Sequence, residues 1–541
     1  MPAKKYDDLS KDELIRLLEA RDRRDATRFG LVWEANEIER DKALNGDFVA
    51  LDLDAELSCG GAPWRNLIIE GDNFDALRYL RMTFAGRVKC IYIDPPYNTG
   101  NRDFVYNDRF VDREDLWRHS KWCEFMYQRL TLAKDLLAQD GLIFVSIDGN
   151  ELFHLGLLMN SVFGESNMIA DVVWQKRYGG GAKTKHVVSL HEYVLCYARS
   201  SEAIGELTLP PDPEARKRYR FRDSKYDTRG PFFTQPLATT SMDSRPNLRY
   251  PIPYKGEEIW PEKQWQWSPE RTMQALANDE LVFSKAKGKW SVRYKQYLKD
   301  EEGNERGAKP MSIIVGPYTQ EGTNAMKALL GDGKAFTFPK PVGLIELLLS
   351  YIADPSALVL DFFAGSGTTA HAVHKLNAED GGNRRVILVS NAEATEEEPD
   401  KNLCRDVCAT RVRRVVEGYI DTPGLGGDFA YLRCRRLPPG RLTEIDHAQV
   451  WTALQLTHCP TVAPFEDRPV LVAEGEEARL IYVPHFRARN APALAKAVRE
   501  STAAIVYTWQ PDLVKQRLGD AENVQVEAVP DSLARRFGMR I

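Results

Sequence analysis

The run Asp94-Pro95-Pro96-Tyr97 combines a carboxylate, two stiff prolines and an aromatic ring directly after an apolar stretch. Residues 88–93 are mostly β-branched or aromatic, which predicts a short buried strand. The prolines end this strand, because neither can donate a backbone hydrogen bond and both restrict φ. The pattern therefore predicts an acid and a ring held on a rigid turn at a strand's carboxyl end, where open parallel sheets bind ligands.

This turn offers two hydrogen-bond acceptors, the Asp94 carboxylate and the Pro95 carbonyl, which together could accept both hydrogens of an exocyclic amino group. Tyr97 supplies a flat face on which a base can stack. An aromatic amine is a poor nucleophile because its lone pair is delocalised, and two acceptors favour the pyramidal form that attacks. The alternative is purely structural: a strand followed by a proline turn, with Asp94 capping a turn or helix.

A second pattern spans Asp361 to Thr369, with the sequence Asp-Phe-Phe-Ala-Gly-Ser-Gly-Thr-Thr. A strand that ends in an acid, followed by a glycine turn and a helix, is typical of a nucleotide-type cofactor loop. The turn contains no lysine, which argues against a phosphate-binding P-loop, and Ala370 stands where a dinucleotide motif has glycine. A smaller adenosyl ligand with a charged amino-acid end remains, and Asp361 is available for its ammonium group.

Alternating strands and helices surround both patterns. Strands are predicted at 66–70, 88–93, 142–147, 172–174 and 193–197, with a helix through Leu77, Leu80 and Phe84 and another at 117–137. The rhythm is lost near 200 and returns near 336, with helices at 344–352 and 402–417 and strands at 357–360 and 386–390. This βαβ rhythm predicts an α/β fold with a parallel sheet. Residues 8–45 are predicted to be helical.

The composition is that of a globular protein, with 43% hydrophobic and 28% charged residues among 541. A net charge of −5 means that any binding of nucleic acid must use a local patch. Eight scattered cysteines without a Cys-x-x-Cys pair fit a reducing cytoplasm and predict no metal site. We find no membrane span and no signal peptide.

Residues 213–229 hold seven basic and three acidic residues with aromatics between them, and Trp260, Trp265 and Trp267 follow. Such a composition suits phosphate contacts and stacking on bases. A solvated charged surface is the other interpretation, and composition alone leaves both open.

The two anchoring patterns together resemble the amino-methyltransferases that modify DNA with S-adenosylmethionine. Their order, with Asp-Pro-Pro-Tyr first and a long insertion between, is similar to the permuted beta group of that family. A wider set of elements looks like the Mod subunit of type III restriction-modification systems. These are Gly71-Asp72-Asn73, Ser146 to Glu151, Val162 to Asn167, His191-Glu192-Tyr193 and Pro339-Lys340-Pro341.

The resemblance implies a Rossmann-like methyltransferase fold with a mostly parallel sheet and a circularly permuted motif order. It implies five segments: an N-terminal helical arm (1–60), a catalytic half (61–199), a target-recognition domain (200–330), a cofactor-binding half (331–422) and a C-terminal α/β accessory domain (423–541).

The resemblance also implies residue roles. The catalytic residues would be Asp94, Pro95, Pro96 and Tyr97. The cofactor-binding residues would be Asp361, Phe363, Ala364, Gly365, Ser366, Gly367, Thr368, Asp72, Asn73, Lys340 and Pro341. Family members usually place an acid after the next strand to hold the ribose, and here Asn391 or Glu393 must serve.

The implied activity is methylation of adenine N6 in double-stranded DNA, within a restriction or other defence system. The implied partners are a second copy of the chain and a helicase-nuclease restriction subunit. The implied DNA contacts lie in the basic run at Arg216, Lys217, Arg218, Arg220 and Arg222. Four alternatives stay open: a solitary adenine methyltransferase, an N4-cytosine methyltransferase, a methyltransferase of the same fold that acts on RNA, and a catalytically inactive recognition subunit.

Overall fold

The computed structural model describes residues 47–100, 105–106, 109–110, 117–179, 186–209, 216–240, 243–331, 336–394, 398–438, 444–519 and 523–537. The described chain divides into two compact units. One contains the described parts of 1–53, 74–83 and 433–541, and the other contains those of 54–73 and 84–432. The predicted helical segment at 8–45 lies outside the described residues.

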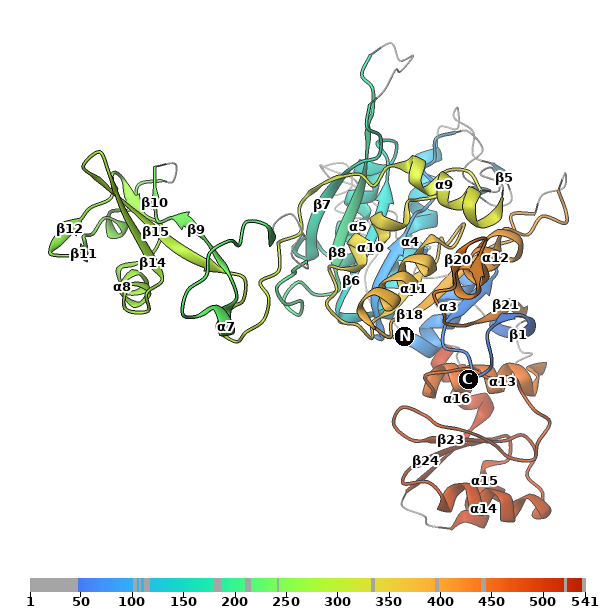
Figure 1. Ribbon diagram of the computed structural model, residues 1–541. Coiled ribbons are helices and arrows are strands. Elements are labelled where there is room, and N and C mark those ends of the chain that lie inside the picture. The colour runs from blue at the N-terminus through green and yellow to red at the C-terminus, as the bar shows by residue number, and fades with distance from the viewer. Residues whose placement is uncertain are drawn as a thin grey trace, which may run out of the picture. The chain divides into compact units, whose positions relative to one another are not determined.

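Ten described strands form a central sheet in the order β1-β21-β2-β18-β17-β3-β6-β8-β7-β16 (Figure 1). From β2 to β6 neighbouring strands run parallel, whereas β8 is antiparallel to both β6 and β7, and β16 is parallel to β7. This arrangement confirms the predicted α/β fold with a mostly parallel sheet. The strands are β1 (Phe48–Cys59), β2 (Leu67–Glu70), β3 (Val88–Ile93), β6 (Leu137–Ile147), β7 (Met168–Gln175), β8 (His191–Ala198), β16 (Ile313–Val315), β17 (Leu358–Asp361), β18 (Arg385–Ser390) and β21 (Phe429–Leu437).

Eight described helical segments connect or flank these strands. They are α3 (Asn73–Phe84), α4 (Arg118–Leu136), α5 (Leu152–Phe163), α9 (Thr319–Leu330), α10 (Val342–Leu349), α11 (Thr368–Asp380), the π-helical segment η3 (Cys404–Ala409) and α12 (Thr410–Glu417). A short two-stranded sheet is formed by β4 (Val105–Tyr106) and β5 (Arg109–Phe110). The predicted helix at 402–417 is therefore correct in place but opens with a π-helical turn.

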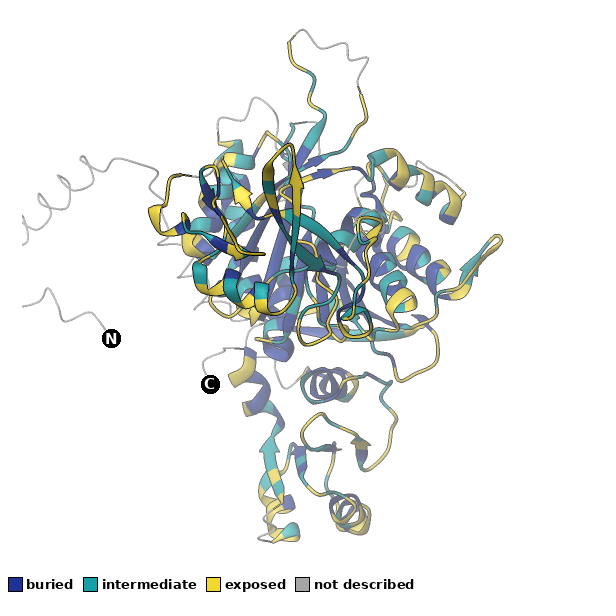
Figure 2. Ribbon diagram, turned by 60° about the vertical axis from the view of Figure 1, so that its left-hand side comes forward, coloured by how far each residue is buried: buried dark blue, intermediate teal, exposed yellow. Residues whose placement is uncertain are grey.

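The buried apolar strands explain why the sheet forms the core. In β3, Cys90 and Tyr92 point to one face and join a cluster with residues of α10, α11 and α12, while the alternate residues Ile91 and Ile93 are buried as well. A strand buried on both faces is expected to be continuously apolar, as β3 is from Cys90 to Ile93. Figure 2 shows buried residues concentrated in the strands of the central sheet.

Two predicted segment boundaries need correction at the sheet. Residues 48–59 form strand β1 rather than part of an N-terminal helical arm, since apolar and acidic residues alternate from Leu51 to Asp54 with the period of a strand. Strand β21, which falls within the predicted accessory domain at 423–541, also joins the central sheet.

The insertion after β8 has its own small core. It contains α7 (Tyr226–Arg229), α8 (Pro269–Ala277), the three-stranded sheet β14-β15-β9 and two short strand pairs. The strands are β9 (Phe232–Pro236), β10 (Ala238–Thr239), β11 (Ile252–Tyr254), β12 (Glu257–Ile259), β13 (Gln264–Trp265), β14 (Leu281–Ala286) and β15 (Lys289–Tyr297).

The end of the predicted segment 200–330 returns to the central sheet, because β16 pairs with β7. Trp265 belongs to the core of the insertion and is 2% exposed, so it is not a surface ring for stacking on bases. Trp260, by contrast, is 54% exposed.

The C-terminal unit contains a four-stranded sheet in the order β22-β23-β24-β25. Its elements after β21 are α13 (His447–His458), β22 (Leu471–Ala473), β23 (Arg479–Val483), α14 (Ala491–Arg499), β24 (Ala504–Thr508), α15 (Pro511–Leu518), β25 (Val524–Ala528) and α16 (Val529–Phe537). Apolar residues of β23, β24, α14 and α15 form its core. Over the described ranges, no helix is both long and apolar enough to cross a membrane.

Candidate active site

Strands β3 and β17 are direct neighbours, and their register brings the two predicted patterns together. Val359 pairs with Cys90 and Leu360 with Ile91, in parallel. Asp361 and Asp94 therefore both stand at the carboxyl ends of adjacent strands. We call residues 94–97 the proline turn and residues 361–369 the glycine turn.

Lys340 holds the carboxylate of the proline turn. Its ammonium nitrogen lies 2.8 Å from Oδ1 and 2.7 Å from Oδ2 of Asp94. The Lys340 side chain is 10% exposed and the Asp94 side chain 26%. Lys340 directly precedes Pro341, the N-cap of α10. A residue of the second half of the chain thus supplies the counter-charge for Asp94 in the first half.

The same ammonium group orders the tyrosine of the turn. Lys340 donates to the Tyr97 hydroxyl at 2.9 Å, and that hydroxyl donates to Glu192 Oε2 at 3.2 Å. Lys176 binds the other oxygen of Glu192 at 2.5 Å. Two lysines and two carboxylates thus alternate around Tyr97 and fix its ring beside Asp94.

Burial and these charges shift the pKa values of the network. Burial raises the pKa of Asp94, and the Glu192 charge adds to this rise, while Lys340 opposes it. Burial acts to lower the pKa of Lys340, but the carboxylates of Asp94 and Glu192 outweigh it and raise this pKa. Burial acts to raise the pKa of Glu192, but Lys340 and Lys176 outweigh it, so this pKa is lowered. Lys340 thus opposes the rise in the Asp94 pKa, and the two carboxylates favour the charged form of Lys340.

The glycine turn depends on two residues with positive φ. Gly365 has φ of 48° and Gly367 has φ of 76°, a region that residues with a Cβ rarely adopt. A Cβ at Gly365 would also stand 2.8 Å from Cζ of Phe336. The turn leads directly into α11, whose first backbone N–H groups are available to a ligand at this end of the helix.

Asp361 at the start of this turn is 3% exposed. Its Oδ1 accepts a hydrogen bond from the Phe363 amide at 3.0 Å, and its Oδ2 accepts one from the Thr369 hydroxyl at 2.5 Å. No ion pair reaches it from the residues that the structure describes. Burial raises the pKa of Asp361 to about 7, with the Asp94 charge adding to the rise.

Arg411 of α12 holds the glycine turn through its hydroxyl groups. The guanidinium nitrogen Nη1 donates to Ser366 Oγ at 3.0 Å and to Thr368 Oγ1 at 2.7 Å. Arg411 is fully buried, and burial lowers its pKa to about 10. Ser366 and Thr368, predicted as cofactor ligands, are themselves 3% and 6% exposed. Their hydroxyl groups therefore stabilise the turn through Arg411, and a ligand would contact the backbone of the turn instead.

The other predicted cofactor residues lie on the flanking strand ends. Asn73 follows β2, donates from Nδ2 to the Phe362 carbonyl at 3.0 Å, and accepts from Arg129 Nε. Arg129 also pairs with Asp72 at 3.3 Å, and the Asp72 side chain is 49% exposed. Asp72 and Asn73 are thus tied to the glycine turn, as a shared site requires.

Asn391 and Glu393 follow β18, between the ends of β2 and β17. Both side chains are exposed. Glu393 pairs with Lys401 at 3.4 Å and has φ of 51°. Both residues therefore stand near the edge where a ribose would lie, and the choice between them stays a prediction.

The family of the chain is decided by its sequence over this same region. The sequence model described as "DNA methylase" matches residues 88–390, which include both turns and the insertion between them. The chain belongs to the DNA methylase family. The matched range begins at β3 and ends at β18, so it contains the two adjacent strands that carry the aspartates.

Relatives of the chain include Mod subunits of type III restriction-modification enzymes and a type II methyltransferase. The Mod subunit of the type III restriction-modification enzyme StyLTI from Salmonella typhimurium is 34% identical over 412 residues, which cover 70% of this chain and 61% of that subunit. The type II methyltransferase M.KpnI from Klebsiella pneumoniae is 33% identical, covering 59% of this chain and 79% of the relative. The EcoPI Mod subunit of Escherichia phage P1 is 32% identical, covering 61% and 58%. The chain thus spans about 60% of the length of these Mod subunits.

Several residues of this DNA methylase site were not assigned a role by sequence analysis, among them Lys176, Arg129 and Thr369. Glu192 and Arg411 support the two turns, and Phe336 lies against Gly365. Lys340 was predicted as a cofactor ligand, and its observed contacts are to Asp94 and Tyr97. The His191-Glu192-Tyr193 motif was a usable signal for Glu192, whereas nothing in the sequence around Arg411 indicated its contacts.

Proposed function

We propose that this DNA methylase transfers a methyl group from S-adenosylmethionine to the N6 amino group of adenine in double-stranded DNA. The observation that carries the proposal is the register of β3 and β17, because it supports a single site formed by the proline turn and the glycine turn. One turn offers acceptors for an amine, and the other offers a backbone cradle beside a buried acid.

The cofactor fits the residues at the glycine turn. Burial raises the pKa of Asp361 and the Asp94 charge adds to the rise, while no cation among the described residues pairs with it. An ammonium group of the amino-acid end of a cofactor would supply that cation. Asp361, Phe363, Ala364, Gly365 and Thr368 would hold this end, and Asp72, Asn73 and either Asn391 or Glu393 would hold the adenosine.

The reaction needs little more than positioning and hydrogen bonding. S-adenosylmethionine would supply an electrophilic methyl group. The amine nitrogen would attack the methyl carbon in line, the C–S bond would break, and S-adenosylhomocysteine would leave as a neutral thioether, without a covalent enzyme intermediate. Asp94 and the Pro95 carbonyl accept the two amine hydrogens, which directs the nitrogen lone pair away from them. Lys340 stabilises the ionised form of Asp94 next to Glu192. After transfer the nitrogen carries a surplus proton, which passes to Asp94 and then to water.

The target base must leave the duplex to reach Asp94, since an exocyclic amine is paired inside the helix. Tyr97 would stack on the extruded base, and its ring is fixed by hydrogen bonds of its hydroxyl to Lys340 and Glu192. A platform that is already ordered loses little conformational entropy when the base binds.

The insertion at 200–330 would contact DNA through its basic run. Arg216, Lys217, Arg218, Arg220 and Arg222 are all exposed, although Arg216 pairs with Glu305 and Arg222 stacks on Tyr226 at 4.2 Å. Replacing Arg218 or Arg220 by alanine should weaken binding to all duplexes alike and lower the salt dependence by about one released counterion each. Unchanged salt dependence would exclude these residues as phosphate contacts.

As a modification subunit, the protein would act as a homodimer and recruit a helicase-nuclease restriction subunit. The similarity to Mod subunits supports this role and favours adenine. The similarity to a type II methyltransferase, of which the chain covers a larger share, supports a solitary enzyme as the second candidate.

The test is methyl transfer from isotope-labelled S-adenosylmethionine to duplex DNA, followed by nucleoside analysis, with the Asp94→Asn variant as control. We expect N6-methyladenine from the wild-type protein alone. N4-methylcytosine would mean that cytosine is the target base. Methyl transfer to RNA in a parallel assay, with none to DNA, would mean that RNA is the substrate. No product, with cofactor and DNA still bound, would indicate an inactive recognition subunit. Methylation-aware sequencing of DNA from cells that express the protein would then give the recognition sequence.

A further inference from the structure

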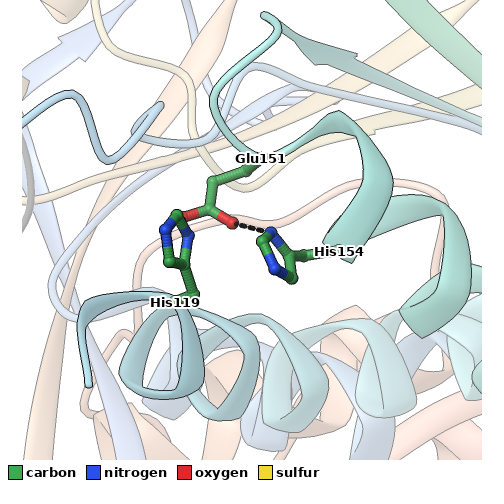
Figure 3. A group of neighbouring side chains, drawn as sticks. All are labelled: His119, Glu151 and His154. Atoms are coloured by element: carbon green, nitrogen blue, oxygen red, sulfur yellow. Dashed lines mark hydrogen bonds and ion pairs between the residues drawn. The ribbon is translucent and has the colours of Figure 1, made fainter. Parts of the chain in front are cut away.

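Three side chains outside both turns converge on one point. His119 lies in the first turn of α4, Glu151 directly precedes α5, and His154 lies in the first turn of α5 (Figure 3). His119 Nδ1 is 2.7 Å from Glu151 Oε1, and His154 Nδ1 is 2.9 Å from Glu151 Oε2. One donor atom from each residue lies within 4.8 Å of the others. The two imidazole rings are stacked with centroids 4.5 Å apart.

The carboxylate of Glu151 is fully buried, with a side chain that is 0% exposed. In the part of the chain that the structure describes, no lysine or arginine lies within ion-pair distance of it. A buried carboxylate without a cation is costly. The two histidines are its only described ion-pair partners, and they are charged only when protonated.

The hydrogen bonds of this cluster are incomplete. Glu151 Oε2 and His154 Nδ1 are both buried and have no hydrogen-bond partner among the described residues, although they are 2.9 Å apart. The contact is therefore an ion pair rather than a well-directed hydrogen bond, and a neutral His154 with an unprotonated Nδ1 would present a ligand atom beside Oε2. An ion that accepts electron pairs from both would satisfy them together.

We infer that His119, Glu151 and His154 bind a divalent transition-metal ion of the zinc class. Two imidazole nitrogens and one carboxylate are a common ligand set for such ions, whereas Mg²⁺ and Ca²⁺ prefer oxygen ligands. The ion would supply the positive charge that Glu151 lacks. Three protein ligands leave one coordination position for water.

The site would stabilise the proline turn rather than take part in the chemistry. Asn98 directly follows Tyr97, is 1% exposed, and adopts φ of 54°. Its Nδ2 donates to Glu151 Oε1 at 2.5 Å and to the Arg118 carbonyl at 3.2 Å. An ion bound by Glu151 would thus connect α4, α5 and the residue after the catalytic tyrosine through a ligand and its hydrogen-bond partner.

Arg118 provides a way to test the ion against a purely hydrogen-bonded cluster. Its Nε donates to His119 Nε2 at 3.2 Å, which places the ring proton on Nδ1. Metal binding at Nδ1 moves that proton to Nε2, so Arg118 must turn away. Arg118→Met removes the competing donor and a repelling charge, and should tighten ion binding. Weaker binding by this variant would overturn the assignment.

The experiment is titration of the chelator-treated, full-length protein with Zn²⁺ and Co²⁺, followed by calorimetry, thermal unfolding and Co²⁺ absorption. We expect one equivalent of Zn²⁺, a raised Tm, and a Co²⁺ spectrum typical of mixed nitrogen and oxygen ligands. The His119→Ala/His154→Ala variant should bind at least about 100-fold more weakly. Because each of these imidazoles is about one-third exposed, the single His154→Ala variant should fold and show the same loss.

His447→Ala is the matched control, because His447 and His485 form another close imidazole pair, 3.1 Å apart, in the C-terminal unit. This variant should keep the full equivalent. Wild-type protein that binds no ion, or a double variant that binds as tightly as wild type, would overturn the assignment. Loss of the ion in His447→Ala would do the same.

Discussion

The proline turn and the glycine turn each begin with an aspartate at the end of a buried strand, yet they treat its charge in opposite ways. Asp94 is 26% exposed and pairs with the Lys340 ammonium group. Asp361 is 3% exposed and receives only hydrogen bonds, from the Thr369 hydroxyl and the Phe363 amide. A neighbouring cation favours the ionised form of an acid, whereas the burial of an unpaired acid favours its neutral form.

The supports behind the two turns differ in the same sense. Lys340 and Lys176 compensate the carboxylates around Tyr97, so the proline turn is held by alternating charges. Arg411, which supports the glycine turn, donates hydrogen bonds to the hydroxyl oxygens of Ser366 and Thr368. Among the described residues, no carboxylate forms an ion pair with it. The counter-charge of the proline turn thus comes from the protein, whereas under the proposed function the cofactor would supply the counter-charge of the glycine turn.

The largest effect should come from exchanging the two aspartates for asparagine one at a time. Asp94→Asn should lower the methyl transfer rate by about 10³-fold or more, because the amine loses its charged acceptor, while cofactor affinity survives. Asp361→Asn should raise the Kd for the cofactor, while the transfer rate at saturating cofactor stays near that of the wild-type protein. Each variant is the control for the other, measured by single-turnover kinetics and calorimetry. Equal loss of both properties in both variants would mean that the turns are not separate in function.

Removing the counter-charge of the proline turn should be the next largest effect. Lys340→Met leaves Asp94 and Glu192 buried without their shared cation, which should lower the free energy of unfolding by about 3–5 kcal/mol. Lys375→Met, at a pair in which the lysine is 42% exposed, should cost less than about 1 kcal/mol. Chemical denaturation measures both. Adding Asp94→Asn to Lys340→Met should restore part of the loss.

The support of the glycine turn should show a smaller effect. In the Arg411→Lys variant the planar guanidinium that contacts both hydroxyls is replaced by a single ammonium group. This change should lower the free energy of unfolding by about 1.5–3 kcal/mol. It should also raise the Kd for S-adenosylmethionine while the rate at saturating cofactor stays near that of wild type. Arg413→Lys, two residues along α12 and bound instead to the Leu57 carbonyl, is the control. A reduced saturating rate would place Arg411 in the chemistry.

The smallest effect is a pH dependence of stability and cofactor binding that Asp361 of the glycine turn should produce. The pKa of Asp361 rises from its ordinary value of 3.8 to about 7 in the folded protein. Its contribution to stability is therefore complete below about pH 4 and is lost as the pH rises to about 7. A cationic cofactor favours the ionised form of Asp361, so binding should release a proton. Below the pKa of Asp361, the affinity should therefore increase by up to about tenfold for each unit that the pH rises. Calorimetry in buffers of different ionisation enthalpy measures this release, and Asp361→Asn should abolish it.

The amino-acid sequence alone determined the two turns and the strands before them. Val88 to Ile93 and Leu358 to Asp361 are buried strands, and Asp94 and Asp361 end them as predicted. Such features are local, because strand period, proline and glycine act on the backbone within a few residues. The mostly parallel sheet followed from the same alternation of elements.

Only the tertiary structure decided which side chains meet. Lys340 is 246 residues from Asp94 in the chain, and Arg411 is 43 residues from Thr368. The insertion hid Trp265 in its core, although its composition suggested a surface role. Glu151 and His154 are three residues apart at the start of α5, but His119 is 32 residues before Glu151 and meets them because α4 and α5 start side by side. Such partners depend on strand order and helix packing, which bring together residues whose separation along the chain holds no local signal.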